Sequence, residues 1–258
     1  MFTFIILGII EGFTEFLPIS STGHLILARY FFGLETTSPL AVDAILQLGA
    51  ILAVYIYFGP ELWAMIKDFF QKKQQLVWSI VIATIPALLI GLFVEKYIDS
   101  YLRTPTVVAT VLIIGAVLFL LVEYFYKNGY GQLNQIGPKQ ALSIGLAQCL
   151  AFFPGFSRSG ATIMAGQMNK LTREAAARFS FYLSIPIITL SGLKKLYDVL
   201  KVGLPQGIGM ELTVGTITAF VVAITSIHFL LSFLKKHGLN LFAYYRIVLG
   251  LVVLIKLM

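Results

Sequence analysis

Two stretches of this sequence share one pattern and lie a constant distance apart. They read EGFTEFLPISSTGH, over residues Glu11–His24, and QCLAFFPGFSRSGAT, over residues Gln148–Thr162. The offset is 137 positions, as from Ser20 to Ser157. In each stretch an apolar run meets a proline and a cluster of Ser and Gly, and a second apolar run follows. Because proline and small polar residues interrupt helices, each stretch predicts a helix, a polar break and another helix.

The composition around these stretches is that of an integral membrane protein. Hydrophobic residues make up 58% of the 258 residues, charged residues only 12%, and the mean hydropathy is +0.88. A soluble domain carries about 25% charged residues. We therefore expect a single membrane domain over residues 1–258. Polar groups at membrane depth are costly, so the two breaks are the first candidates for a functional site.

Charge and terminal features narrow the class further. The net charge of +7 comes from Lys and Arg in short segments between apolar runs, where such residues set topology and contact anionic head groups. We therefore expect no nucleic-acid partner. The first ten residues lack a basic leader before Glu11, which predicts no cleavable signal peptide. The single Cys149 excludes an internal disulfide.

Six apolar runs are long enough, or nearly so, to cross a bilayer, which takes roughly 20 residues. Hydrocarbon offers the backbone no hydrogen-bond partners, and the runs show no alternation, so we expect helices and not strands. The predicted spans are 41–58, 76–94, 106–126, 175–196, 212–234 and 239–257.

The two stretches with polar breaks are too short and too interrupted to span. We expect them to form re-entrant hairpins, from 2–17 with 20–32 and from 139–153 with 159–168. Each half then has one hairpin and three spans, and an odd number of spans makes the second half enter from the opposite side. The sequence thus predicts an all-α polytopic protein with an inverted repeat, about 1–126 and about 139–258. Its site should lie where the breaks meet.

The first break combines two carboxylates with a row of small polar residues. Glu11 and Glu15 are four positions apart, so they lie on one helix face. Two carboxylates that close repel each other, and a divalent cation such as Mg²⁺, held also by substrate phosphate, would relieve both. A pair that only snorkels to a surface is the structural alternative. The next helix should begin with free N–H groups that form an anion site. The candidate residues at its start are Ser20, Ser21, Thr22, Gly23 and His24.

The second break supplies positive charge. Arg158 offers a planar fork suited to two phosphate oxygens, and Gly155 and Gly160 let the backbone approach a ligand. The structural alternative is that Arg158 only pairs with a glutamate. Gln148, the repeat mate of Glu11, is predicted to orient the hairpin or the substrate. The other candidate substrate-binding residues are Ser157, Ser159 and Thr162.

These residues resemble the motifs of a known family. The stretch 11–24 resembles the acidic first motif of the undecaprenyl pyrophosphate phosphatases, membrane enzymes tied to bacitracin resistance. PGFSRSGAT, over 154–162, is similar to that family's second motif, and YRI, over 245–247, is similar to a lesser pattern in the last span. The resemblance covers the whole chain in length and span order. It implies hydrolysis of undecaprenyl pyrophosphate to undecaprenyl phosphate and inorganic phosphate, which recycles the lipid carrier for cell-wall polymers.

The resemblance also implies dependence on Mg²⁺ or Ca²⁺ and a site open to the outer face of the bacterial plasma membrane. It implies essential roles for Glu11, Glu15, His24 and Arg158, with Ser21 as nucleophile and water as the alternative. From the residues, Mg²⁺ on the glutamates would bridge the pyrophosphate, and His24 would take the proton of Ser21 or water. Bacitracin is expected to act on the substrate and not on the protein. A homodimer is left open.

A transporter or flippase of a polyprenyl phosphate or another anionic substrate is the alternative function. Inverted repeats with paired hairpins are common in carriers, and a fold does not fix a function. The acidic pair argues against it, because a phosphate carrier has little need of Glu11 and Glu15 beside its anion.

Four further polar residues outside the two breaks are considered as candidates. Asp43 and Gln47 share a face of the first span and are expected either to line the cavity or to bond between helices. His228 is predicted to be structural or interfacial. Arg246, near the start of the last span, is predicted to snorkel.

The loops predict an orientation. Those at 59–75, 127–139, 168–174 and 235–238 share one side and hold nine Lys and Arg residues, Lys72 and Lys73 among them, against six on the other side. The positive-inside rule then places these loops in the cytoplasm and both termini outside.

Overall fold

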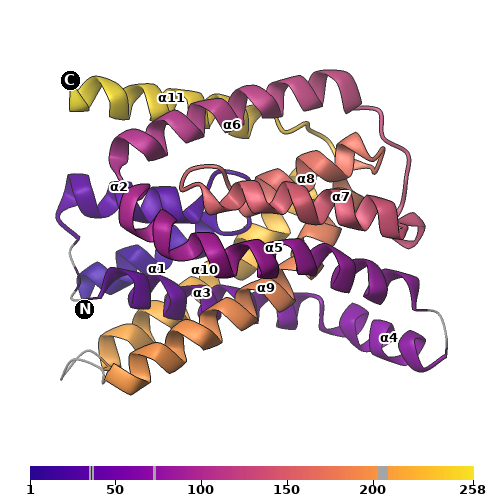
Figure 1. Cartoon of the computed structure of the whole chain (residues 1–258), viewed down its shortest axis with the longest axis horizontal. Helices are drawn as coiled ribbons and strands as arrows, with labels where there is room; N and C mark the ends of the chain where they lie inside the picture. The colour runs from indigo at the N-terminus through magenta and orange to yellow at the C-terminus, as the bar shows by residue number, and fades with distance from the viewer. Residues whose placement is uncertain (35, 37, 72–73, 203–208) are drawn as a thin grey trace.

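Among the residues that the structure describes, helices form the regular structure, apart from an isolated bridge between Gly131 and Leu171 (Figure 1). The computed structural model describes residues 1–258 except 35, 37, 72–73 and 203–208, so Lys72 and Lys73 lie outside the described residues. The α-helices are α1 (Phe2–Thr14), α2 (Ser21–Phe32), α3 (Pro39–Tyr57), α4 (Gly59–Phe70), α5 (Gln75–Tyr101), α6 (Pro105–Tyr126), α7 (Pro138–Gln148), α8 (Arg158–Met168), α9 (Arg173–Val202), α10 (Gly209–Leu234) and α11 (Asn240–Leu257). Two short 3₁₀ helices are η1 (Leu133–Gln135) and η2 (Cys149–Phe152).

Among the described residues, six helices are long and apolar enough to cross a membrane: α3, α5, α6, α9, α10 and α11. They coincide with the six predicted spans, and the all-α polytopic class is confirmed. Two are longer than predicted, because α5 continues to Tyr101 and α9 continues to Val202. Charged residues occupy these extra turns, which is why hydropathy alone ended the runs earlier.

The segment 59–75 was expected to be a loop, and the structure places helix α4 in it. Pro60 occupies the first turn, Glu61 lies near the helix N-terminus and Lys67 near its C-terminus, all favourable positions. Three of its large apolar side chains are exposed, those of Trp63, Ile66 and Phe70, while Leu62 and Met65 pack against the core. In Figure 1 it lies beyond the end of α3, to one side of the bundle. This amphipathic composition is typical of a helix that lies in the membrane interface.

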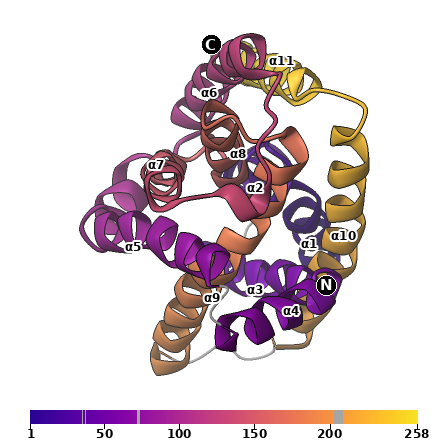
Figure 2. The ribbon, with the colours of Figure 1, turned by 90° about the vertical axis from the view of Figure 1, so that its right-hand side faces the viewer.

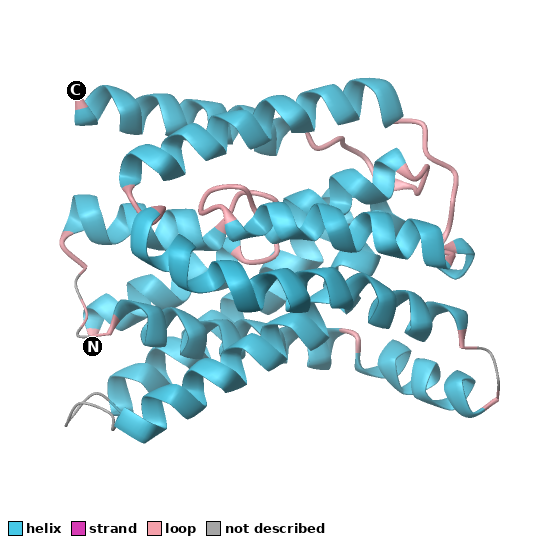
Figure 3. Ribbon diagram, viewed as in Figure 1, coloured by secondary structure: helices cyan, strands magenta, loops and turns pink. Residues whose placement is uncertain are grey.

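Each polar break is an elbow between two short helices. The first elbow, residues 15–20, joins α1 to α2, and the second, residues 149–157, joins α7 to α8 and contains η2. Both helices before the breaks end earlier than the predicted residues 17 and 153. Figure 3 shows the two elbows together in the middle of the bundle, enclosed by helices. Irregular backbone is tolerated at membrane depth only when protein surrounds it in this way.

In both halves, a glycine at an equivalent position allows two helices to pack closely. Gly8 on α1 and Gly145 on α7 are offset by 137 positions. A Cβ on Gly8 would lie 2.4 Å from the carbonyl oxygen of Gly215 on α10, and one on Gly145 would lie 2.4 Å from that of Ala83 on α5. Such close approach is how helices pack without help from the hydrophobic effect. Figure 2 shows α1 beside α10, α7 beside α5, and α6 beside α11. The inverted arrangement of the halves 1–126 and 139–258 stays a prediction.

Candidate active site

Glu15 is the residue on which both elbows converge. It follows directly after α1 and is buried. Its Oε2 accepts a hydrogen bond from Ser21 Oγ at 2.5 Å and a longer one from Gln47 Nε2 at 3.4 Å, while its Oε1 lies 2.9 Å from Arg158 Nη2. Ser21 and Arg158 are the first residues of α2 and α8, offset by 137 positions. The repeat thus presents a hydroxyl and a guanidinium to one carboxylate.

Hydrogen bonds hold the two elbows against each other. Ser20 and Ser157 both have positive φ, 76° and 79°, and each caps the helix that follows it through its own Oγ. Ser20 Oγ also accepts a hydrogen bond from the Gly155 amide at 3.2 Å, and Ser159 Oγ donates to the Leu17 carbonyl at 3.0 Å. A positive φ at serine costs on the order of 1–3 kcal/mol and persists only where the surroundings enforce it. Such strain is frequent at functional sites.

Arg158 divides its fork between two partners. Its Nη2 pairs with Glu15, and its Nη1 donates a hydrogen bond to the Ser180 carbonyl on α9 at 3.0 Å. Thr162 Oγ1 donates to Ser180 Oγ at 2.7 Å, which fixes α8 against α9 at the same place. The pairing of Arg158 with a glutamate, given above as the structural alternative, is therefore present. Both side chains line a cavity, however, so a ligand bound there can replace Glu15 as the partner of Arg158.

A cavity of about 150 Å³, the elbow cavity, lies between the two elbows and α9. Its polar lining consists of Glu15, Ser20, Ser21, Thr22, Gln47, Gln148, Ser157, Arg158 and Ser191. Gln148 is 1% exposed, and both atoms of its amide lack a hydrogen-bond partner. A buried amide without partners is costly, so Gln148 is suited to bond a ligand in this cavity.

A larger and mainly apolar cavity of about 440 Å³, the apolar cavity, adjoins the elbow cavity. The two share Thr22, Gln47 and Phe152 among their lining residues. Leucine and isoleucine side chains of α3, α5 and α9 contribute to its wall. Its charged lining residues are Asp43, Asp99, Arg103, Lys194 and Lys195. A polar chamber that opens beside an apolar one fits a molecule with a charged head and a hydrocarbon tail.

Several predicted binding residues do not line either cavity. Gly155 has a φ of 105°, and a Cβ there would lie 2.6 Å from the Val108 carbonyl oxygen. A Cβ on Gly160 would meet Phe119 at 2.8 Å, and one on Gly23 would lie 3.1 Å from Val108. These glycines therefore let α6 approach the elbows, where we had expected a ligand. The hydroxyls of Ser159 and Thr162 likewise form hydrogen bonds with other groups of the protein.

Glu11 lies one turn before Glu15, and the structure allows a limited test of the expected metal site. Glu11 is 1% exposed, does not line the elbow cavity, and its Oε1 has no hydrogen-bond partner. In the described part of the chain, no group of three or more His, Cys, Asp and Glu side chains could hold a metal ion. Two carboxylates are nevertheless what Mg²⁺ commonly takes when phosphate oxygens and water complete its shell. The unpartnered oxygen of Glu11 fits that use.

His24 is turned away from Ser21. Its Nδ1 lies 2.7 Å from the Ser20 carbonyl oxygen, and its Nε2 lies 2.7 Å from the Tyr245 hydroxyl on α11, whose ring stacks on the imidazole. Because a carbonyl only accepts, Nδ1 carries the hydrogen, and Nε2 accepts from Tyr245. Neither nitrogen is then placed to take a proton from Ser21. The contact with Tyr245 joins residues 221 positions apart, which sequence reasoning missed.

The residues outside the breaks take different places. Asp43 lines the apolar cavity and pairs with Arg29 at 2.6 Å and Arg103 at 2.9 Å. His228 bonds to the Tyr57 hydroxyl at 3.1 Å, which agrees with a structural role. The expectation that Arg246 snorkels is wrong, because its side chain is fully buried. It points inward, to the backbone of both elbows.

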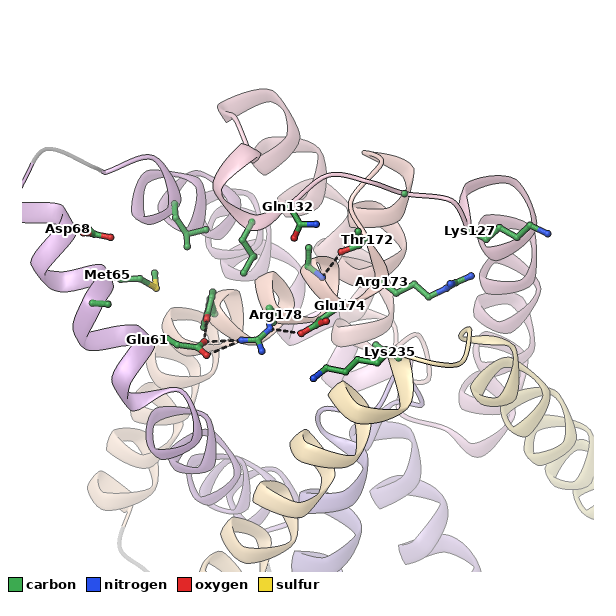
Figure 4. Close-up of a pocket in the computed structure, with 17 residues that line it drawn as sticks. Glu61, Met65, Asp68, Lys127, Gln132, Thr172, Arg173, Glu174, Arg178 and Lys235 are labelled. Atoms are coloured by element: carbon green, nitrogen blue, oxygen red, sulfur yellow. Dashed lines mark hydrogen bonds and ion pairs between the residues drawn. The ribbon is translucent and has the colours of Figure 1, made fainter.

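A third cavity of about 820 Å³, the distal cavity, contains none of the predicted site residues. The first turns of α9 line it, whereas the elbow cavity is lined by α9 residues from Ile187 onward. Figure 4 shows Arg178 at its wall between Glu61 of α4 and Glu174. Its size does not make it the reaction site, because none of the residues of the two elbows lines it, and its Arg178 pairs with Glu61 and Glu174.

Comparison with known proteins agrees with this geometry. Residues 4–252 match the family described as bacitracin resistance protein BacA. The undecaprenyl-diphosphatase of Flavobacterium johnsoniae is 41% identical over 257 residues, which cover 97% of this chain and 94% of that protein. That of Corynebacterium efficiens is 40% identical, covering 98% and 89%. Undecaprenyl-diphosphatase 3 of Acinetobacter baylyi is 41% identical, covering 98% and 96%. With its two elbows, its six membrane-spanning helices and these relatives along its whole length, the chain belongs to the BacA family.

Proposed function

We propose that this protein hydrolyses undecaprenyl diphosphate to undecaprenyl phosphate and inorganic phosphate, and so returns a lipid carrier to cell-wall synthesis. The observation that carries the proposal is the cluster of Glu15, Ser21 and Arg158 at a buried cavity that adjoins an apolar one. The name undecaprenyl-diphosphatase, borne by relatives about 40% identical, supports the substrate.

Glu15 is the proposed general base. It already accepts the hydrogen bond of Ser21 Oγ, so the proton can pass to it as Oγ attacks the terminal phosphorus. The bond from Oγ to phosphorus forms, the bond to the bridging oxygen breaks, and undecaprenyl phosphate leaves. Glu15 then gives this proton up to the departing phosphate. Water attacks the phosphoserine and passes a proton to Glu15, the bond from phosphorus to Oγ breaks with release of inorganic phosphate, and Glu15 returns the proton to Ser21 Oγ. If water is the nucleophile from the start, Glu15 takes its proton directly.

Arg158 and Gln148 are the proposed phosphate ligands. The guanidinium lies beside Glu15 and can offer two parallel N–H groups to the terminal phosphate when its present partners are exchanged. Gln148 offers an amide that has no partner of its own. Phosphoryl transfer depends mainly on positioning and on neutralising charge, which these two side chains provide.

A divalent cation, Mg²⁺ or Ca²⁺, is the proposed cofactor. Glu11 and Glu15 would hold it, and the unpartnered Glu11 Oε1 supports this assignment. When bound, the ion would neutralise charge that develops on the pyrophosphate oxygens. The chain's own contribution is to keep two carboxylates on one helix face, with Glu15 at the elbow cavity and Glu11 one turn before it.

We propose that the prenyl tail of the bound substrate extends from the phosphate site through the apolar cavity. That cavity adjoins the proposed phosphate site and lies among helices that cross the membrane. We further propose that the protein resides in the bacterial plasma membrane with this cavity at the outer face. Bacitracin would then bind the exposed diphosphate substrate and not the protein. The acidic pair of Glu11 and Glu15 favours hydrolysis over transport as the main function, because a phosphate carrier has little need of two carboxylates beside its anion.

Phosphate release from undecaprenyl diphosphate by the purified protein in detergent micelles tests the proposal. Micelles have no second compartment, so a transporter would release nothing. We expect Mg²⁺-dependent release by the wild type and loss of it in Glu15→Gln. The matched control is Glu61→Gln at the distal cavity, which should keep its rate. No release by folded wild-type protein, with metal supplied, would leave the transporter as the better reading.

A further inference from the structure

We propose that Arg246 is a positioning residue, which ties the two elbows together and thereby sets the shape of the proposed catalytic cavity. Arg246 lies in α11, far from both elbows in the sequence, and it is the largest fully buried side chain in the described part of the molecule. It does not line the elbow cavity. Its effect must therefore pass through the backbone that it contacts. The proposal rests on the proposed site but requires no particular nucleophile.

The two contacts are made at equivalent positions of the repeat. Arg246 Nη1 lies 3.4 Å from the Pro18 carbonyl oxygen, and Nη2 lies 3.2 Å from the Gly155 carbonyl oxygen. Pro18 and Gly155 are 137 positions apart, the same offset that relates Ser21 to Arg158. One guanidinium thus binds the same backbone group in both elbows. A contact made to one elbow alone would not relate them to each other.

The elbows need such a donor because their carbonyls have left the helix. A buried carbonyl without a partner is costly at membrane depth, where water is scarce. Pro18 and Gly155 come after the last turns of α1 and α7, so helical N–H groups no longer serve them. A planar guanidinium with several donors can satisfy two carbonyls at once, whereas an ammonium offers only a compact point charge.

The surroundings of Arg246 are shaped to hold its guanidinium in place. Gly115 on α6 makes the room, because a Cβ there would lie 2.0 Å from Nη2. The guanidinium also lies over the Phe119 ring, with Cζ 5.6 Å from the ring centre. In the part of the chain that the structure describes, no carboxylate forms an ion pair with Arg246. Burial without a counter-ion is expensive, so we infer that the contacts to the elbows justify it.

The neighbouring residue reinforces the first elbow from the same helix. Tyr245 holds His24, and His24 Nδ1 donates to the Ser20 carbonyl. Two successive residues of α11 therefore fix carbonyls on both sides of Ile19. Since Ser21 follows at once, a shift of the first elbow would move its hydroxyl relative to Arg158. A misplacement of about 1 Å can cost roughly 10²-fold in rate.

The first experiment measures kcat, KM and melting temperature of Arg246→Met and Arg246→Lys in detergent, with undecaprenyl diphosphate. Arg246→Met keeps an unbranched buried chain but removes every donor. We expect kcat to fall by roughly 10²-fold with KM little changed. Arg246→Lys keeps a donor for only one of the two carbonyls, so its kcat should lie between those of the wild type and Arg246→Met. A purely structural arginine would instead lower the melting temperature while the folded protein kept its kcat, and that result would overturn the proposal.

If Arg246→Met does not fold, a second pair of variants tests the positioning role of Arg246. Gly115→Ala leaves Arg246 in the chain but displaces Nη2 from the Gly155 carbonyl. Its matched control is Gly250→Ala, where a Cβ would lie 2.6 Å from Ile113 and 2.8 Å from the Ala109 carbonyl oxygen in the same α6–α11 interface, and not against Arg246. We expect kcat to fall in Gly115→Ala and to hold in Gly250→Ala. Equal kcat in the two variants, with the wild type active, would refute the role of Arg246 but leave the proposed function standing.

Discussion

At the scale of single residues, the site depends on the carboxylate of Glu15, which has three polar partners. Glu15 accepts from Ser21 and Gln47 and pairs with Arg158. Arg158 and Gln47 can turn to phosphate oxygens while Ser21 keeps its hydrogen bond to Glu15, so the substrate would exchange existing bonds for new ones and leave the carboxylate with a partner. That exchange keeps the cost of desolvation low, since breaking a buried pair without replacement is costly.

Arg158→Lys tests whether the geometry of the guanidinium matters beyond its charge. A lysine keeps the charge but cannot offer two parallel donors to a phosphate. We expect kcat to fall by roughly 10²-fold, close to the loss in Arg158→Ala, because removing preorganised donors usually costs that much. Rate and melting temperature should be measured on the same preparation. Full kcat in a stably folded Arg158→Lys protein would remove the bidentate role.

The residue types of the site could be predicted from the sequence, but their partners could not. A Glu pair, a Ser row and an Arg at repeated positions stood out because polar groups are rare in apolar sequence. The sequence could not place His24 on Tyr245, since that contact depends on how α11 packs. For the same reason Arg246 was expected to reach outward. Gly115, which makes its room inward, is an ordinary glycine in an apolar run.

At the scale of elements, the hairpins are held by glycines that the repeat preserves. Gly8 and Gly145 each allow a short helix to lie close to a long one, α1 on α10 and α7 on α5. This packing fixes the direction from which each elbow enters the centre. Hydropathy found the long helices, whereas α4 was missed because charged residues interrupt its apolar run in the sequence.

Gly8→Ala and Gly145→Ala should each destabilise the protein by about 1–3 kcal/mol, the usual cost of overpacking. The added methyl would lie 2.4 Å from a backbone carbonyl oxygen, which cannot move as a side chain can. Thermal unfolding in detergent measures this. Gly59→Ala is the control, because nothing lies within 4 Å of its added Cβ. Equal melting temperatures in all three variants would contradict the packing argument.

Helix α4 joins the bundle through its acidic residue. Glu61 accepts from Arg178 at 3.0 and 3.1 Å and from the Tyr182 hydroxyl. Glu61→Gln should change stability by no more than about 1 kcal/mol, because the pair is partly exposed. Hydrolysis should keep its rate, since the elbow cavity lies further along α9. Loss of activity in a folded Glu61→Gln protein would show that the distal cavity takes part in the reaction.

At the scale of the whole molecule, the cavities divide between the two ends of the bundle. The distal cavity lies with α4 and the loop residues Lys127 and Lys235, while the apolar cavity lies with Lys194 and Arg103. Both chain termini lie at one end in Figure 1, and α4 lies at the other. The excess of positive charge on the α4 end supports the proposal that this end faces the cytoplasm.

Cysteine labelling in intact cells tests this orientation. In a Cys149→Ser background, Lys235→Cys should resist an impermeant thiol reagent, and Lys194→Cys should react. Both positions are followed in the same cells, so each serves as the other's control. Reaction at 235 without reaction at 194 would place the proposed active site on the cytoplasmic face and refute the assigned orientation.

The central claim is that the cavity between the two elbows is where phosphate is transferred. Its most direct test is a structure determined with a non-hydrolysable methylene analogue of a prenyl diphosphate and Mg²⁺. We predict the terminal phosphonate within hydrogen-bond distance of Arg158 and Gln148, with Ser21 Oγ facing its phosphorus and the prenyl chain in the apolar cavity. A phosphonate bound instead in the distal cavity, beside Arg178 and Lys235, would contradict the account.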